Sequence, residues 1–230
     1  MCVAIREYGT PEAPLTLLLK PLPGDSNIEL MIGASRNLAR KTKGETKVTL
    51  DPSGQNFAAY YYDAYAFKLR RHISRYYVQD IPLEALGKAT AINFDTDQAS
   101  RREFALTDMA QLRKVLDRCQ DDLLRSWGAD PAALAMIATR AKMVAGYVSD
   151  LDYPKGAANR GEQGTVALRW VVDPKGQPVG CTIVSSSGSL ELDSVSCALV
   201  SARFRYEPAL DTSGKPVASW VSQRITWRLP

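Results

Sequence analysis

The sequence predicts an α+β protein in which a sheet-rich N-terminal domain is followed by a small C-terminal domain. Three observations predict this organisation: short apolar runs separated by turn residues up to Phe104, helical periodicity after Thr107, and alternating strand patterns after Tyr153. A chain of 230 residues with 45% hydrophobic content is also long enough to bury two cores. We therefore expect one domain at residues 1–147 and a second at residues 148–230.

The first domain is expected to be an antiparallel sheet that ends in one or two helices. Turn signals such as Pro52 and Gly54 separate runs that are rich in aliphatic residues. The tyrosines at Tyr60–Tyr62 fit a strand at the rim of the core better than a ligand platform. The expected strands are LTLLL at Leu15–Leu19, IELMI at Ile28–Ile32, KVTLD at Lys47–Asp51 and ATAINF at Ala89–Phe94.

Two helices are expected to follow this sheet. Apolar residues recur at helical spacing over residues 108–125, and Thr107 is a candidate N-cap. Asp130 and Pro131 suit the cap and the first position of a second helix, which we expect to run to about Lys142. The apolar face of the first helix comprises Leu112, Val115, Leu116, Cys119 and Leu123.

The second domain shows the order strand, strand, helix, strand. Gly164–Val172 is an alternating run, DPKG at Asp173–Gly176 is typical of a turn, and a second alternating run follows. SSSGS at Ser185–Ser189 supplies caps for a helix at Leu192–Phe204, and Val217–Leu229 closes the domain as a strand. This order predicts a three-stranded antiparallel sheet with one helix over one face. The apolar strand faces comprise Val166, Leu168, Trp170, Val172, Val179, Cys181, Ile183, Val221, Ile225, Trp227 and Leu229.

The sequence contains four cysteines, which are Cys2, Cys119, Cys181 and Cys197. Four cysteines allow three pairings, and their spacings match no CxxC motif or Cys/His zinc signature. We therefore expect no metal site. Two disulfides fit an oxidising compartment, whereas four unrelated buried thiols in a cytosolic protein are the alternative.

One pairing is favoured by the predicted C-terminal domain. Cys181 lies on the core face of the second strand, and Cys197 shares a helical stripe with Val200 and Phe204, which places both sulfur atoms in one layer. The stripe that competes for this buried face consists of Leu192, Val195 and Leu199. We favour Cys181 with Cys197, so that the other two cysteines join the N-terminus to the first helix. Closing a loop of about 16 residues contributes on the order of 3 kcal/mol.

Composition and charge argue against several classes of function. The net charge is only +4 and both signs are mixed along the chain, unlike the concentrated basic face of a nucleic-acid-binding protein. No apolar run approaches the ~20 residues of a membrane span. The opening MCVAIREYG lacks the basic and apolar regions of a signal peptide, so we expect the signal of an exported protein to lie outside these residues.

No enzyme or cofactor motif is evident, and we expect neither catalytic residues nor a cofactor. The sequence contains no GxSxG, GxGxxG, P-loop or HExxH pattern. Its single histidine, His72, lies in FKLRRHISRYY, where a solvated surface is expected. The alternative there is a basic and aromatic patch around Arg70 and Arg71 that contacts anionic lipid, cell-wall polymer or a partner. Ser185–Gly188 and Asp193 offer a nucleophile and an acid but no base.

Five ordered motifs in the last third of the chain resemble the C-terminal domain of TonB proteins. YPKGA at Tyr153–Ala157 is similar to the YPxxA that opens this domain, and GTVALRWVVDPKGQPVGCTIVSSSG at Gly164–Gly188 resembles its first hairpin. LD at Leu192–Asp193, RFRYEPA at Arg203–Ala209 and GKPV at Gly214–Val217 resemble its helix, the exit from that helix and the entry to its final strand. Five motifs in the right order make the resemblance more specific than any one of them.

The resemblance implies a periplasmic protein of a Gram-negative bacterium that binds an extended segment, the TonB box, of an outer-membrane receptor and supports transport. It implies that the segment adds as a further strand to the exposed final strand of the sheet. Arg224 and Arg228, opposite Ile225 and Trp227, are then available to acidic residues of the partner, although a plain edge strand with solvated arginines is the alternative. The expected contact residues are Val221, Ser222, Gln223, Arg224, Ile225, Thr226, Trp227 and Arg228.

Upstream of these motifs the chain has features of its own. CQDDLLRSWG at Cys119–Gly128 is similar to a CxxxL(L)xxWG helix end that precedes TonB-like domains with a paired cysteine in alphaproteobacterial proteins. TonB energy transducers carry a membrane helix and a proline-rich spacer, whereas a folded region is expected here, and the polar position after YPxxA is Ala158. The resemblance is therefore carried over only for the domain and its binding surface, and force transduction is left open. Alternatively, the N-terminal domain is a sensor or inhibitor that binds an envelope partner and the TonB-like domain is a scaffold; pairing of edge strands into a homodimer is a further option.

Overall fold

The computed structural model describes residues 2–25, 27–36, 42–66, 69–95 and 101–229, with the side chains of Arg101 and Pro131 left aside. The chain forms two compact units, Met1–Leu123 and Leu124–Pro230. Both contain sheet and helix, which confirms the predicted α+β class. The predicted boundary at residue 147 would divide the second unit further and stays a prediction. Within the described ranges, no helix is both long enough and apolar enough to cross a membrane.

In its described residues, the first unit contains eight strands of one sheet and two helices. Their bounds are β1 (Ala4–Thr10), β2 (Ala13–Lys20), β3 (Ile28–Ala34), β4 (Lys43–Asp51), β5 (Gln55–Ala66), β6 (Arg71–Val78), α1 (Leu83–Lys88), β7 (Ala91–Asp95), β8 (Arg101–Ala105) and α2 (Met109–Ser126), whose last turn belongs to the second unit. The antiparallel strand order is β1-β2-β3-β6-β5-β4-β7-β8.

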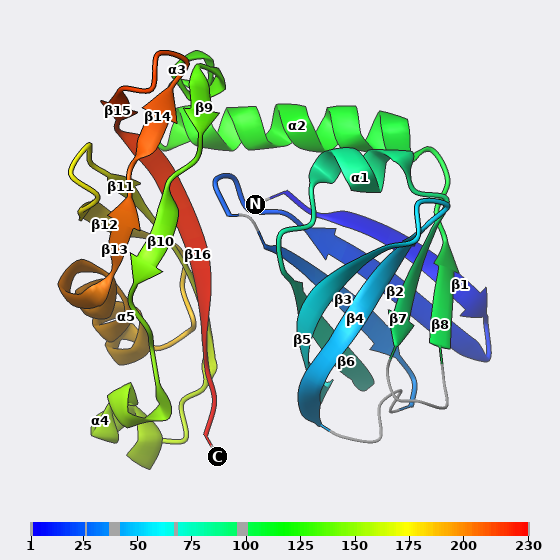
Figure 1. Ribbon diagram of the computed structural model, residues 1–230. Coiled ribbons are helices and arrows are strands. Elements are labelled where there is room, and N and C mark those ends of the chain that lie inside the picture. The colour runs from blue at the N-terminus through cyan, green and yellow to red at the C-terminus, as the bar shows by residue number, and fades with distance from the viewer. Residues whose placement is uncertain (1, 26, 37–41, 67–68, 96–100, 230) are drawn as a thin grey trace. The chain divides into compact units, whose positions relative to one another are not determined.

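This sheet is strongly curved, and α1 and α2 lie at one end of it (Figure 1). Its two outermost strands meet through side chains. The Tyr8 hydroxyl of β1 donates to the Ala105 carbonyl of β8 at 2.7 Å, and the rings of Tyr8 and Phe104 lie 5.1 Å apart. The concave face therefore encloses a core that both helices help to cover.

The core of the first unit combines the concave face of the sheet with one face of α2. Tyr76 and Phe94, from strands that are not neighbours, pack at 4.6 Å between ring centres. The α2 residues that contact this core are Met109, Leu112, Leu116, Cys119 and Leu123. Val115 was expected among them, but 57% of it is exposed, because the buried stripe follows the spacing of Leu116 and Cys119 and leaves Val115 at its margin. Cys2 forms a disulfide with Cys119.

The environment of His72 differs from the solvated surface that was expected. His72 lies in β6, between β3 and β5, and its Nδ1 atom is 3.2 Å from Oδ1 of the buried Asp63. The Ser74 hydroxyl donates to the other carboxylate oxygen at 2.6 Å. His72 is half-buried, because alternate residues of β6 face the core, a period that the arginines and tyrosines between them obscure. Phe67 and Lys68 of the suggested patch lie outside the described residues.

In its described residues, the second unit contains two three-stranded sheets, one two-stranded sheet and several helices, of which α5 is the longest. Their bounds are α3 (Pro131–Ala135), β9 (Ile137–Thr139), β10 (Lys142–Ala145), the 3₁₀ helix η1 (Asp150–Asp152), α4 (Lys155–Asn159), β11 (Gly164–Val172), β12 (Pro178–Ser185), α5 (Leu190–Arg203), β13 (Arg205–Glu207), β14 (Ala209–Asp211), β15 (Pro216–Val217) and β16 (Ser219–Trp227). The main sheet has the antiparallel order β12-β11-β16, and α5 packs on one face of it. This arrangement confirms the predicted ββαβ domain.

The second predicted helix is much shorter than expected. Asp130 caps α3 by accepting from the Ala132 N–H at 2.9 Å, as predicted, but the helix ends at Ala135. β9 and β10 replace the rest of it and pair with β14 and β13. The run between Ala132 and Lys142 favours a helix locally, and strand pairing with residues about 70 positions later overrides that preference.

The core of the second unit lies between α5 and the main sheet. Val166, Leu168, Trp170 and Val172 of β11 are all fully buried, as their alternation predicts. On α5 the buried face lies between the two stripes that were considered, and neither stripe is buried as a whole. Its buried residues are Leu192, Asp193, Ser196, Leu199 and Val200. The predicted last strand is interrupted at Ala218, so β16 begins at Ser219.

Candidate partner-binding strand

β16 forms one edge of the main sheet. It pairs with β11 in an unbroken antiparallel register, from Ser219 opposite Val172 to Trp227 opposite Gly164. All the predicted contact residues from Val221 to Trp227 lie in this strand, and Arg228 directly follows it. The structure therefore gathers the predicted contact residues on one edge strand, whereas their part in binding stays a prediction.

The two faces of β16 differ as the sequence predicted. Ile225 and Trp227 are buried against α5, and Val221 packs at the margin of the same core. On the opposite face, the Thr226 hydroxyl lies 3.0 Å from the Thr165 hydroxyl of β11. Ser222, Arg224, Thr226 and Arg228 each take part in further interactions in this structure. A role for Arg224 and Arg228 with acidic residues of a partner stays a prediction.

β12, at the other edge of the sheet, is irregular. Its register with β11 shifts between Ala167 and Leu168 and again between Arg169 and Val171. The expected alternation of Val179, Cys181 and Ile183 toward the core is wrong for two of the three: Val179 is 47% and Ile183 39% exposed. Bulges of this kind twist an edge strand and hinder the addition of another strand.

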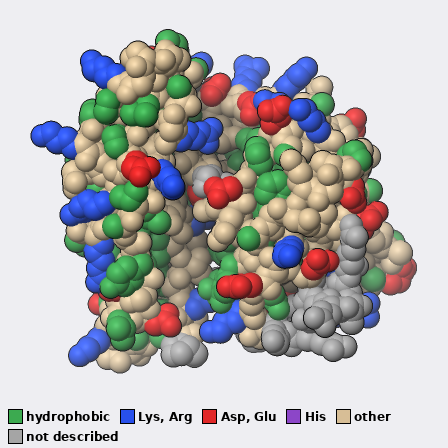
Figure 2. All heavy atoms as spheres, viewed as in Figure 1, with side chains coloured by type: hydrophobic (Ala, Val, Ile, Leu, Met, Phe, Trp, Pro, Cys, Tyr) green, Lys and Arg blue, Asp and Glu red, His purple; other side chains and the backbone are tan. Residues whose placement is uncertain are grey.

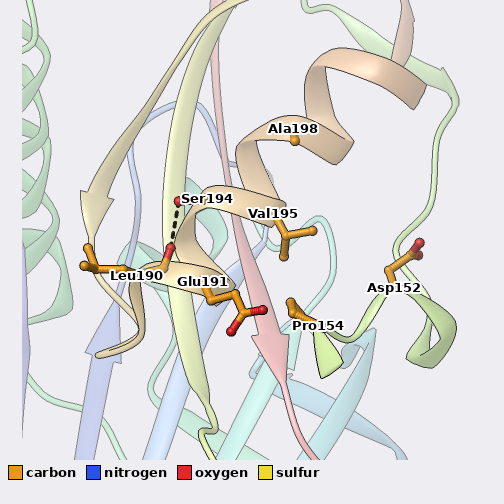
Figure 3. Close-up of a pocket in the computed structure, with 7 residues that line it drawn as sticks. All are labelled: Asp152, Pro154, Leu190, Glu191, Ser194, Val195 and Ala198. Atoms are coloured by element: carbon orange, nitrogen blue, oxygen red, sulfur yellow. Dashed lines mark hydrogen bonds between the residues drawn. The ribbon is translucent and has the colours of Figure 1, made fainter. Parts of the chain in front are cut away.

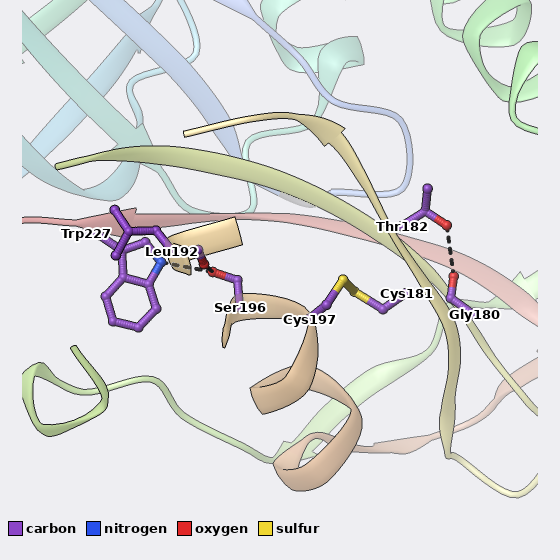
Figure 4. The surroundings of a disulfide bond; sticks show 7 residues. All are labelled: Gly180, Cys181, Thr182, Leu192, Ser196, Cys197 and Trp227. Atoms are coloured by element: carbon purple, nitrogen blue, oxygen red, sulfur yellow. Dashed lines mark hydrogen bonds between the residues drawn. A yellow bond between two sulfur atoms is a disulfide. The ribbon is translucent and has the colours of Figure 1, made fainter. Parts of the chain in front are cut away.

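α5 connects to both edge strands through consecutive residues, Ser196 and Cys197 (Figure 4). The buried Ser196 hydroxyl accepts from the Trp227 Nε1–H at 2.9 Å and donates to the Leu192 carbonyl at 2.7 Å. Cys197 forms a disulfide with Cys181 of β12, with 5.7 Å between Cα atoms. One helix thus holds β12 by a covalent bond and β16 by a buried hydrogen bond.

Tyr153, from the YPKGA motif, supports the same end of β16. Its ring packs edge-on against Trp227, with 5.4 Å between ring centres. Its hydroxyl donates to the carbonyl of Glu162, and burial raises the pKa of the phenol. Ala158, at the position that follows this motif, lies in α4. The motif therefore helps to fix the side chain of Trp227, the last residue of β16.

The RFRYEPA motif combines an ion pair with core aromatics. Arg203 donates to both carboxylate oxygens of Asp152, at 2.7 and 2.8 Å. Hydrogen bonds from Arg203 and from the Ser149 N–H hold the pKa of Asp152 well below its usual range. Phe204 and Tyr206 pack around Trp170, and burial raises the pKa of the Tyr206 hydroxyl. The motif thus joins the end of α5 to the segment that precedes the main sheet.

A shallow depression of about 630 Å³ lies beside the start of α5 (Figure 3). Its lining residues are Asp152, Pro154, Leu190, Glu191, Ser194, Val195 and Ala198. Both of its carboxylates are already paired, Asp152 with Arg203 and Glu191 with Arg160 at 2.8 Å. None of the predicted contact residues lines this depression, so the two features are separate.

Hydrogen bonds order the serine-rich turn before α5. The buried carboxylate of Asp193 accepts from the Ser186 hydroxyl at 2.6 Å, and from the N–H and hydroxyl of Ser187 at 2.9 and 2.7 Å. The Ser189 hydroxyl caps the helix by accepting from the Leu192 N–H. Asp193 therefore acts as an acceptor that orders the turn.

In Figure 2, basic and acidic side chains both occur across the visible face. Among the residues that the structure describes, no group of three or more His, Cys, Asp or Glu side chains is placed to hold a metal ion. The edge strand β16 is therefore the candidate partner-binding site.

Ser196 was missed by sequence reasoning. Its signal is a polar residue within an apolar helical stripe, at spacing i+4 from Leu192 and i−4 from Val200. The partner of a buried hydroxyl is set by tertiary packing, so the sequence did not indicate Trp227. A serine in such a position predicts at most that some buried group needs a hydrogen bond.

The fold is a small α+β domain whose three-stranded sheet has one regular edge strand. Residues 149–229 match the family described as Gram-negative bacterial TonB protein C-terminal, so this part of the chain belongs to the TonB C-terminal domain family. The match confirms the resemblance seen in the motifs, and the family is a transport-related one of periplasmic type rather than one of enzymes. No curated protein matches the chain.

Proposed function

We propose that the C-terminal unit binds an extended segment of an outer-membrane receptor by strand addition to β16, and that it does so in the periplasm in support of transport. The contact residues would be those from Val221 to Arg228. The observation that carries this proposal is the position of β16: it is a regular edge strand in a domain of the TonB C-terminal family. Residues 148–230 would form the domain that carries the family fold.

The contrast between the two edges supports β16 as the docking strand. An added strand bonds through the main chain and needs a regular run of backbone groups. β16 keeps one register with β11 along its whole length, whereas β12 shifts register twice. Sheet order and regularity support the proposal independently of the side chains of Ser222, Arg224, Thr226 and Arg228, which have interactions already.

The proposal can be tested by titrating the isotope-labelled full chain with synthetic peptides from receptor N-termini. Amide shifts should follow Val217 to Leu229 and be small along β12. Peptides in which alternate amides are N-methylated give the matched control. An added strand uses N–H groups of every second residue, so one methylated set should bind normally and the other about a hundredfold more weakly, through loss of two or three hydrogen bonds.

Two results would count against the proposal. The first is the absence of β16 shifts at millimolar peptide, and the second is equal binding by both methylated peptides, which would indicate recognition through side chains. The alternative, in which the N-terminal unit binds an envelope partner and the C-terminal unit is a scaffold, stays a hypothesis.

A further inference from the structure

Trp127 holds an arginine of the main sheet from outside the family-matched region. It follows α2 directly and belongs to the second unit, whereas the family match begins at residue 149. The guanidinium carbon of Arg169 in β11 lies 5.6 Å from the ring centre of Trp127 and 4.7 Å from that of Trp220 in β16. Arg169 thus contacts two indole rings, and we call these three residues the Trp–Arg–Trp cluster.

The indole rings are the principal partners of the Arg169 charge. No ion pair to Arg169 occurs among the described residues, and its buried Nε atom has no hydrogen-bond partner there. Burial lowers the pKa of this guanidinium. A cation over an aromatic ring is attracted most strongly where water is excluded. The cluster therefore replaces the carboxylate that a partly buried arginine would otherwise require.

The cluster acts on the first part of β16. Trp220 is paired with Val171, and Ser222 with Arg169, so the cluster lies over residue pairs near the start of β16. It lies on the face of the sheet opposite Trp170 and the core. At the other end of the strand, Trp227 is held from the α5 side by Ser196. β16 is thus held at both ends and from opposite faces, once by a residue outside the matched family region.

Two strands that precede the family match also pair with strands inside it. β9 pairs with β14 and β10 with β13. Together with Trp127, these pairings integrate the chain from Leu124 onward into the C-terminal fold. The residues before position 149 are therefore part of the folded body that carries β16.

We propose that Trp127 and Arg169 are positioning residues that keep the first part of β16 extended for an incoming strand, so that the partner-binding module begins at Leu124. The role in binding rests on the function proposed above. The positioning itself does not, because it is a property of the free protein. An added strand needs β16 in its paired, extended form. Loss of the Trp127 ring or of the Arg169 guanidinium should let Trp220 and its neighbours open more often.

The test uses the full chain with Trp127→Ala, Trp127→Phe and Tyr147→Ala. In the free protein, amide hydrogen exchange at Trp220 to Ser222 should rise about tenfold in Trp127→Ala and stay within about threefold of wild type in Trp127→Phe, which keeps an aromatic face. Tyr147→Ala is the matched control, since Tyr147 lies 5.3 Å from the guanidinium of Arg203, away from this ladder, and it should leave exchange in β16 unchanged.

Peptide binding gives the second readout. Affinity for a receptor N-terminal peptide that binds the wild type should fall about tenfold in Trp127→Ala, recover in Trp127→Phe and be unaffected by Tyr147→Ala. Wild-type exchange in Trp127→Ala overturns the positioning role. Faster exchange with undiminished affinity overturns its importance for binding. Failure of the wild type to bind any such peptide removes the proposed function, whereas the exchange comparison still decides the positioning.

Discussion

β12 and β16, the two edge strands of one sheet, are held by the same helix in different ways. Cys197 binds β12 through a disulfide, and the preceding residue, Ser196, binds β16 through a hydrogen bond to Trp227. β12 is irregular and covalently fixed, whereas β16 is regular and held only by non-covalent contacts. The difference teaches that one small domain can combine a bulged, covalently fixed edge strand with a regular edge strand held only by non-covalent contacts.

The largest effect is expected from removing the covalent connection of β12. Replacing both Cys181 and Cys197 by Ser opens a disulfide with a sequence separation of 16. The free energy of unfolding of the second unit should fall by about 3 kcal/mol, because the unfolded chain regains the entropy that the closed loop removes. All 4 tryptophans follow Leu124, so tryptophan fluorescence during denaturant titration reports on this unit alone.

The matched control for this experiment is the double substitution of Cys2 and Cys119 by Ser. That disulfide lies in the first unit, so the tryptophan transition should stay where it is in wild type. An unchanged transition in the Cys181 and Cys197 variant would show that the covalent connection of β12 contributes nothing to the fold.

A smaller effect is expected from removing the connection of β16. Ser196→Ala leaves the buried Nε1–H of Trp227 without its acceptor, at a cost of about 1–3 kcal/mol. Ser194→Ala is the matched control, because Ser194 also donates to a carbonyl four residues earlier, at 2.7 Å, but is exposed. It should change stability by less than about 0.5 kcal/mol. Equal losses in both variants would contradict a role for the Trp227 hydrogen bond.

The smallest effect concerns the ion pair that fixes the other end of α5. The folded-state pKa of Asp152 is lowered, so the pair with Arg203 stabilises the fold fully above the unfolded carboxyl pKa of about 3.9. This contribution is lost as pH falls below that value through the folded pKa. The stability difference between wild type and Arg203→Met should therefore be constant from pH 8 to about pH 5 and shrink below about pH 4. Constancy down to pH 2 would assign the effect to packing of the arginine chain.

The buried faces of the regular strands β11 and β16 were predictable from the sequence. The alternation in β11 and at the end of β16 indicated their buried faces, because a period of two is retained wherever one face packs on a core. The pairing of Cys181 with Cys197 was favoured on the same basis and agrees with the structure. The motifs added the family, which periodicity alone does not identify.

Other features depend on contacts between distant residues and could not be predicted. The exposure of Val179 and Ile183 follows from register shifts that the strand pattern does not record. The replacement of a predicted helix by β9 and β10 depends on strands that come about 70 residues later. In the first unit, His72 looked solvated because the buried Asp63 that it contacts is nine residues away and in another strand.

The disulfide between Cys2 and Cys119 has a mechanical consequence. Its sequence separation is 117 residues, so all eight strands of the first unit's sheet lie within one covalent ring. Tension between the start of the chain and the second unit would pass directly from Cys2 to Cys119 and onward through α2. The sheet would bear none of that load, and the reduced protein should extend under pulling where the oxidised protein does not.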